Sequence, residues 1–302
     1  MTLAGGKRAV KDGAHTAFGR ICKLMSRLKI SAISYLNTAP LMWDFEHERV
    51  GEQFDISHTI PSACAEALRA GTADIGIIPA AAYASIPDLV IIPDVAIAAR
   101  RAVRSILLVS RMPAQRSSKE HWTKHVRSVA LDHSSMTSVA LTKILFAKWL
   151  GGEREYRSMA PNLEAMLRAC DAALLIGDPA LQVDRTRYAT LDLAEEWIAR
   201  TGKSFVFAFW AVRKQAIAGH DPAAVVEAFK GSRDHGLAPK KLEAIVQEWA
   251  PRLGITVESV RTYLTQNIHY YLDPPCLDGL KMYYRLGAEI GALTAAPELH
   301  FL

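Results

Sequence analysis

The sequence predicts a two-lobed α/β protein in which each lobe has a mostly parallel central sheet. Its 302 residues exceed the size at which one hydrophobic core usually serves a whole chain. Strand-like apolar runs alternate with segments of helical periodicity, which is the pattern of βαβ units. Two β-rich runs at residues 104–110 and 204–212 predict strands that link a contiguous inserted lobe to a discontinuous one.

The lobe boundaries follow from these two runs. Residues 27–108 and 205–302 are predicted to form the discontinuous lobe, and residues 109–204 the inserted lobe. Residues 1–26 precede the first regular pattern and are expected to be a poorly ordered extension, which leaves open whether translation starts at Met1 or Met25. Charged residues interrupt every apolar stretch there, so no secretory signal is predicted.

The first lobe opens with a βαβ unit. Residues 28–33 form the first predicted strand, and the turn and helix-start residues from Asn37 to Pro40 follow it. Residues 54–59 form a second strand, a helix opens at Pro61 and ends at Gly71, and residues 73–78 form a third strand.

The inserted lobe has a similar alternation. Strands are expected at residues 126–131 and 172–176, and helices at 135–150 and 162–170. The C-terminal part of the chain is predicted to be helical and to close with an aromatic segment at 268–284. Its tyrosines are interpreted as packing residues: Tyr263, Tyr270, Tyr271, Tyr283 and Tyr284.

Composition excludes several classes of function. A net charge of +5 without runs of like charge favours a small anionic ligand over nucleic acid. Four well-separated cysteines predict neither a zinc site nor disulfides, and they indicate a reducing compartment. No apolar stretch is long enough to span a bilayer. His121 and His125 are interpreted as a surface pair, so no metal site is predicted.

Hydroxyl and amide side chains gather where predicted strands end and helices begin. Backbone N–H groups at helix starts attract anions, and open α/β sheets bind ligands at this edge. Each such residue is also typical of a plain helix cap, but their presence in both lobes favours a shared anionic ligand. Arg104 could pair a carboxylate or make a structural salt bridge. The candidate binding residues are Ser34, Tyr35, Thr38, Ser62, Ser105, Ser135, Thr137, Ser138 and Asp178.

Taken together, several segments resemble the chorismate dehydratases of the futalosine route to menaquinone. The resemblance extends from about Leu28 to Tyr284, and the combination is more specific than any one motif. The segments that carry it are SYLNTAPL at 34–41, PSACA at 61–65, GTADIGIIP at 71–79, LDHSSMTSVAL at 131–141, DAALLIGDPA at 171–180 and FVFAFW at 205–210.

The resemblance implies a type II periplasmic-binding-protein fold with the ligand cleft between the lobes, a cytoplasmic location and no cofactor. It implies chorismate as the small-molecule partner and its conversion into 3-[(1-carboxyvinyl)oxy]benzoate and water. Asn37 is the side chain expected to be catalytic. Met136 stands where the family leads us to expect arginine, so backbone donors would make the carboxylate contact there.

None of the matching segments offers an obvious histidine or glutamate base. Our hypothesis is therefore that the enolpyruvyl carboxylate of chorismate removes the proton, while Asn37 binds the leaving hydroxyl or the developing anion.

Three alternative functions are open to the same fold. A non-catalytic solute-binding protein would carry a secretory signal. The related dihydroxynaphthoate synthase does not match the 34–41 segment. A regulator's sensing domain would need a helix-turn-helix, for which residues 1–27 leave no room. The oligomeric state stays open.

Overall fold

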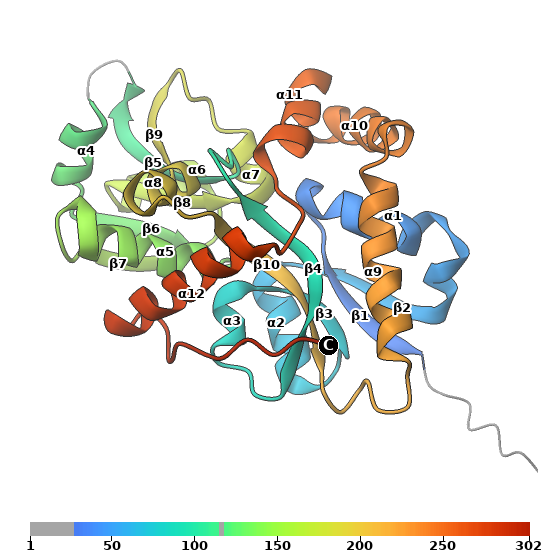
Figure 1. Cartoon of the computed structure of the whole chain (residues 1–302). Coiled ribbons are helices and arrows are strands. Elements are labelled where there is room, and N and C mark those ends of the chain that lie inside the picture. The colour runs from blue at the N-terminus through green and yellow to red at the C-terminus, as the bar shows by residue number, and fades with distance from the viewer. Residues whose placement is uncertain (1–26, 115–117) are drawn as a thin grey trace, which may run out of the picture.

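The computed structural model describes residues 27–114 and 118–302 of the chain. Within these residues, two five-stranded sheets with helices packed around them form two halves that lie side by side (Figure 1). The extension expected at residues 1–26 lies outside the described residues.

The first sheet has the strand order β2-β1-β3-β10-β4. Its strands are β1 (Leu28–Ile33), β2 (Phe54–Thr59), β3 (Ile75–Pro79), β4 (Leu89–Ala99) and β10 (Phe205–Arg213). β1 is parallel to β2 and β3, whereas β10 is antiparallel to both of its neighbours, β3 and β4. The sheet is therefore mixed, but β2, β1, β3 and β4 all run in one direction and only β10 opposes them, which agrees with the mostly parallel sheet that the sequence predicts.

The second sheet has the strand order β7-β6-β8-β5-β9. Its strands are β5 (Ile106–Pro113), β6 (Ser128–Asp132), β7 (Glu155–Met159), β8 (Ala172–Ile176) and β9 (Tyr188–Asp192). It is mixed in the same way, because β5 is antiparallel to β8 and β9. The chain crosses to this sheet between β4 and β5 and returns to the first sheet between β9 and β10. The strand after each crossing, β5 or β10, is the one that is antiparallel to its neighbours.

Helices occupy both halves (Figure 1). In the first half they are α1 (Ala39–His47), α2 (Pro61–Ala70), α3 (Ala80–Tyr83), α9 (Pro222–Gly236), α10 (Pro239–Leu253) and α11 (Val257–Thr262). In the second they are α4 (Lys119–His125), α5 (Thr137–Leu145), α6 (Leu163–Ala169), α7 (Gly177–Leu181) and α8 (Leu193–Thr201). The irregular helices are 3-10 helices η1 (Leu36–Thr38) and η2 (Arg49–Gln53), and π-helices η4 (Phe146–Leu150) and η5 (Tyr263–Asn267). None of the helices described is long and apolar enough to cross a membrane.

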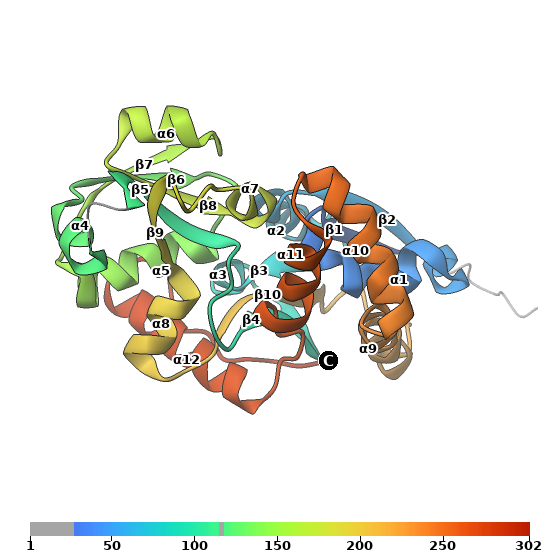
Figure 2. The ribbon, with the colours of Figure 1, turned by 90° about the horizontal axis from the view of Figure 1, so that it is seen from above.

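The last helix, α12 (Pro274–Glu289), ties the two halves together and passes close to both (Figure 2). The Tyr283 hydroxyl donates to the Thr137 carbonyl at the start of α5 over 3.1 Å. The Tyr284 hydroxyl donates to the Ala80 carbonyl at the start of α3 over 2.8 Å. Both tyrosines are buried, so the prediction that they are packing residues is confirmed.

Both faces of the second sheet are apolar. Ile106 and Leu108 of β5 face a core that continues into the first sheet, whereas Leu107 and Val109 face a smaller core under α6. This alternation has the two-residue period of a strand. The larger core therefore spans the junction between the halves and holds the strand ends near each other.

Candidate active site

The polar segment after β1 lies between the two halves. β1 ends at Ile33, the Ser34 N–H donates to the Thr59 carbonyl over 3.1 Å, and the chain then turns through η1 into α1. Pro40, in the first turn of α1, is suited to a helix start because it has no N–H to lose. This turn places Tyr35 and Asn37, both half-buried, at the edge of the first sheet.

A narrow cavity of about 50 Å³ lies beside this turn. The first half contributes residues of β1, η1, α2, β3, β4 and β10, and the second half those of β5, β8 and the starts of α5 and α7. The cavity is lined by Ile33, Tyr35, Asn37, Pro61, Pro79, Ile97, Ile106, Ser135, Met136, Thr137, Ser138, Ile176, Gly177, Phe207 and Ala208. Five of the predicted site residues therefore meet in one place with Asn37 among them: Tyr35, Asn37, Ser135, Thr137 and Ser138.

Among the lining residues that the structure describes, only Tyr35 has an ionisable side chain. Burial raises its pKa, although a hydrogen bond with Ser134 lowers it in part. A neutral phenol, an amide and hydroxyls are therefore the polar side chains that the cavity offers to a ligand. They can hold an anion by hydrogen bonding, but none is a ready proton acceptor near neutral pH.

Asn37 has a partner in its own turn. Its side-chain Oδ1 accepts a hydrogen bond from the Thr38 hydroxyl over 3.3 Å. Thr38 itself is buried behind Asn37 and does not line the cavity.

The start of α5 forms the opposite wall. Asp132 ends β6 and accepts from both the N–H and the hydroxyl of Ser134, over 2.9 and 2.7 Å, which fixes the turn. The Ser135 hydroxyl accepts from the Ser138 N–H over 3.3 Å. Ser135, one residue before the N-cap Met136, therefore bonds an N–H of the first turn of α5, which is close to the helix-capping role that the alternative interpretation of these serines allowed.

The Thr137 hydroxyl is committed to a structural role. It donates to the Phe207 carbonyl on β10 over 3.0 Å and accepts from the Ala81 N–H over 3.1 Å. Both partners belong to the first half of the molecule. Thr137 thus fastens α5 to the first sheet at the cavity wall.

Asp178 joins the halves from the other direction. Its Oδ1 accepts from the Leu36 N–H over 3.1 Å, so α7 holds the turn that carries Asn37. Burial raises the pKa of this carboxyl to about 6, against the opposing effects of the Leu36 N–H and Arg252. Next to it, Gly177 has a φ of 61°, and a Cβ there would meet the Tyr35 ring at 2.7 Å. Glycine is thus needed where Tyr35 approaches the backbone of α7.

Besides Thr38 and Asp178, three further predicted binding side chains do not line the cavity. Ser62 gives its N–H to the Ser134 carbonyl across the junction over 3.1 Å, so this donor at the start of α2 is already bonded. Ser105 is completely buried and its hydroxyl accepts from Tyr263 over 2.8 Å. Ser34 is exposed and faces a separate chamber of about 350 Å³.

This outer chamber shares Ile33 and Tyr35 with the cavity, so the two spaces have a common wall. On its other sides lie side chains of α1, β2 and α10. The Arg252 guanidinium there is bonded to Glu248 over 2.7 Å, and His58 is bonded to Glu46 over 2.8 Å. Both side chains are therefore bonded to local carboxylates.

Arg104 stands in the crossing from β4 to β5 with a φ of 66°. Its N–H donates to Asp192 over 2.6 Å, and its carbonyl accepts from the Arg185 side chain over 2.9 Å. Its side chain lines a third cavity near α11 and does not line the one with Asn37. The backbone of Arg104 thus fixes the segment that joins β4 to β5.

Tyr263 was predicted to be a packing residue, and the hydrogen bond from its hydroxyl to Ser105 was missed. This partner lies 158 positions earlier in the chain, and no local pattern signals such a contact. The one local sign is visible only in the structure: Tyr263 opens a π-helix, and these irregular turns are frequent at functional sites.

One group among the described residues could hold a metal ion: His269, Asp273 and Cys276. Asp273 caps α12 by accepting from the Cys276 N–H, and its other oxygen contacts His269 and Arg100. These bonds account for the cluster as a helix cap with an ion pair, so it gives no reason to assign a metal site. His121 and His125 lie exposed on α4 with rings 4.4 Å apart.

Comparison with known proteins identifies the family. The model of a family described as "Menaquinone biosynthesis" matches residues 28–289. A chorismate dehydratase from Thermus thermophilus is 31% identical over 281 residues, which cover 87% of this chain and 94% of the relative. The chain belongs to the menaquinone-biosynthesis family. The resemblance to chorismate dehydratases noted in the sequence is thereby confirmed.

Solved structures show that this member of the menaquinone-biosynthesis family has the periplasmic-binding-protein fold. A protein from Archaeoglobus fulgidus is similar with a TM-score of 0.68 at 16% identity, covering 88% of this chain and 98% of that one. The periplasmic aliphatic sulphonate binding protein of Escherichia coli gives a TM-score of 0.62 at 15% identity, covering 90% and 94%. At such identities the likeness extends to the fold alone, and the predicted fold is confirmed.

Proposed function

We propose that the protein is a chorismate dehydratase that converts chorismate into 3-[(1-carboxyvinyl)oxy]benzoate and water. The observation that carries the proposal is the position of Asn37, which lines a cavity between the two sheets opposite the serine-rich start of α5. The name of the Thermus thermophilus relative supports the same reaction. The cytoplasm is proposed as the place of reaction on the strength of the family resemblance.

The reaction requires little from a protein. Removal of the proton at ring carbon C3 and departure of the C4 hydroxyl leave an aromatic ring, so aromatisation drives the loss of water. The C3 proton is acidified through the diene and the ring carboxylate. The enzyme must fix one conformation of the substrate and stabilise the developing negative charge.

The polar groups that line the cavity suit these needs. The Asn37 amide would bind the leaving hydroxyl or the developing anion, and the start of α5 would hold a carboxylate through its backbone. Met136 lines the cavity where an arginine was expected, which leaves that contact to backbone donors.

The proposed base is the enolpyruvyl carboxylate of the substrate itself. Among the described lining residues no carboxylate, histidine or lysine is present, so the cavity provides no side chain suited to that step. Asp178, which follows the lining residue Gly177, accepts from the Leu36 N–H and is placed to hold the turn that carries Asn37.

The test is to incubate chorismate with the purified protein and follow its mass. The proposal predicts a product that has lost one water, and Asn37→Ala is expected to lower kcat at least tenfold because a charge-stabilising donor is removed. Asn162→Ala is the matched control, since Asn162 only caps α6. Its turnover should equal that of the wild type.

Two outcomes would contradict the proposal. Chorismate that is bound but returned unchanged would indicate a solute-binding protein. A rate for Asn37→Ala within about threefold of the wild-type rate, which is less than about 0.7 kcal/mol of barrier, would remove Asn37 from the reaction.

A further inference from the structure

A third cavity, of about 260 Å³, has walls from both halves of the molecule. The crossing from β4 to β5, the end of α7 and the loop after α7 form one side, and α11 with the start of η5 forms the other. We call it the arginine cavity, because two of its three charged lining residues are Arg104 and Arg185, the third being Asp184. It shares no lining residue with the cavity of Asn37 or with the outer chamber.

Neither arginine has a carboxylate partner within the part of the chain that the structure describes. Arg185 donates through Nη2 to the Arg104 carbonyl over 2.9 Å, whereas the Arg104 side chain makes no hydrogen bond or ion pair with another described residue. The Asp184 carboxylate accepts from the N–H and the hydroxyl of Thr186 in its own turn, over 2.9 and 2.6 Å. The guanidinium group of Arg104 is therefore not explained by a structural contact.

The two positive charges also act against each other. Burial lowers the pKa of Arg185, and the neighbouring Arg104 lowers it further, while Asp192 and Glu195 oppose this effect. The Asp192 oxygens already accept from backbone N–H groups of the crossing and of α8. An anion bound between the two guanidinium groups would replace their repulsion by two attractions.

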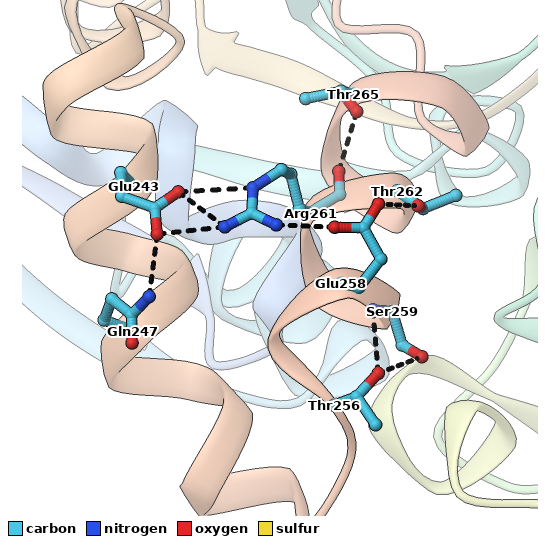
Figure 3. Close-up of polar contacts among 8 residues, drawn as sticks. All are labelled: Glu243, Gln247, Thr256, Glu258, Ser259, Arg261, Thr262 and Thr265. Carbon is cyan, nitrogen blue, oxygen red and sulfur yellow. Dashed lines mark hydrogen bonds and ion pairs between the residues drawn. The ribbon is translucent and has the colours of Figure 1, made fainter.

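The α11 wall of this cavity adds a hydroxyl group and is fixed in place. The Ser259 hydroxyl bonds the Thr256 hydroxyl over 2.8 Å, and when Thr256 donates in this bond the Ser259 proton is free for a ligand. Figure 3 shows Arg261 reaching from α11 towards α10, where it contacts both oxygens of Glu243 at 3.0 Å, and it contacts Glu258 at 2.6 Å. This two-pronged contact holds α11 against α10.

We propose that the arginine cavity binds a compact dianion, either a phosphate group or a short dicarboxylate, between Arg104 and Arg185. The planar guanidinium group presents paired N–H donors that match the oxygens of phosphate and carboxylate. Water occupies about 30 Å³ in the liquid, so the cavity has room for such an anion with bridging waters. The proposed site is separate from the proposed active site and does not depend on the proposed function.

The first experiment titrates phosphate, and separately malonate, into the purified protein by calorimetry at an ionic strength kept constant with sodium chloride. At least one anion should bind saturably with a dissociation constant of about 1 mM or lower, because several charge-assisted hydrogen bonds form. The anion that binds more tightly identifies the class of ligand. Saturable binding of neither anion would overturn the proposal.

Two variants locate the site, Arg104→Gln and Arg185→Gln. Each should weaken the binding at least about tenfold, because a charged pair of donors is lost. Arg187→Gln is the matched control, since Arg187 belongs to the same loop as Arg185 but packs over the Tyr188 ring at 5.0 Å and does not line the cavity. Its affinity should stay within about twofold of the wild-type value, because an exposed charge outside the site is screened. Equal affinities in all three variants would place the anion elsewhere and overturn the proposal.

Thermal unfolding gives a second readout and shows whether each variant is folded. Phosphate should raise the Tm of the wild type and of Arg187→Gln more than chloride does at the same ionic strength, because a ligand of the folded state stabilises it. The rise should be lost in Arg104→Gln and Arg185→Gln. If Arg104→Gln does not fold, Arg104→Lys takes its place, because it keeps the charge and loses only the paired donors. A phosphate-dependent rise of wild-type size in the folded variants of Arg104 and Arg185 would overturn the proposal.

Discussion

At the scale of single residues, the polar side chains that line the cavity are a phenol, an amide and hydroxyls. The resemblance singled out Asn37, and the structure places it in the cavity. The roles of Thr137, Ser62 and Ser105 could not be predicted, because each is decided by a backbone or side-chain partner from the other half of the molecule. Short polar side chains at helix starts look alike in sequence whether they cap, crosslink or bind.

Asp178 is the residue whose titration should be measurable. Its pKa of about 6 in the folded protein lies above the ordinary value of 3.8. Between pH 3.8 and about pH 6 the carboxyl binds more protons in the folded state than in the unfolded state, so the free energy of unfolding falls as pH rises through this range. Above it, the loss stays constant. Asp178→Asn removes the titration. Its free energy of unfolding relative to the wild type should rise by up to about 3 kcal/mol between about pH 4 and about pH 7.

Urea denaturation at a series of pH values is the measurement. The control is Asp184→Asn, in the loop after α7, because Thr186 donors lower the pKa of Asp184. Its difference from the wild type should stay nearly constant between about pH 4 and about pH 7, because a pKa below 3.8 places its titration at lower pH. A stability difference for Asp178→Asn that stays constant from about pH 4 to about pH 7 would show that Asp178 has an ordinary pKa.

At the scale of elements, the sequence predicts strands well where apolar runs are unbroken. The predicted strand at 172–176 coincides with β8, and the predicted helix from Pro61 to Gly71 is α2 with its left-handed glycine cap. The long strand β4 was missed because Pro93 and Asp94 interrupt its apolar run. The structure accommodates them with a φ of 62° at Asp94 and a shift in register against β10. β7 was missed because its side chains are largely polar and none is buried.

The attachment of α5 to the first sheet gives a stability prediction. Thr137→Val keeps the shape of the side chain but leaves the Ala81 N–H and the Phe207 carbonyl without their partner. Buried polar groups without partners cost about 1–3 kcal/mol in free energy of unfolding. Thr142→Val is the matched control on the same helix, because the Thr142 hydroxyl bonds only the Ser138 carbonyl of its own helix.

Denaturant titration of both variants measures their free energies of unfolding. Thr137→Val should lose clearly more stability than Thr142→Val. Equal losses would show that the link between α5 and the first sheet contributes nothing beyond an ordinary side-chain hydrogen bond.

At the scale of the whole molecule, the cavity is smaller than its proposed ligand. A space of about 50 Å³ has room for one or two waters, whereas sites for small molecules usually measure hundreds of Å³. Chorismate can therefore bind only if the walls separate. The bonds that would open are those across the junction, from Leu36 to Asp178 and from Ser62 to Ser134. The outer chamber shares the Tyr35 wall with the cavity, so a movement of Tyr35 would join the two spaces.

The most direct test of the account is a crystal structure of Asn37→Ala grown with chorismate. The account predicts unreacted chorismate between the two sheets, in contact with Phe207 and with the substituted side chain, and with a carboxylate within hydrogen-bonding distance of the backbone at the start of α5. Chorismate in the outer chamber beside Arg252, or no bound chorismate at saturating concentration, would contradict it.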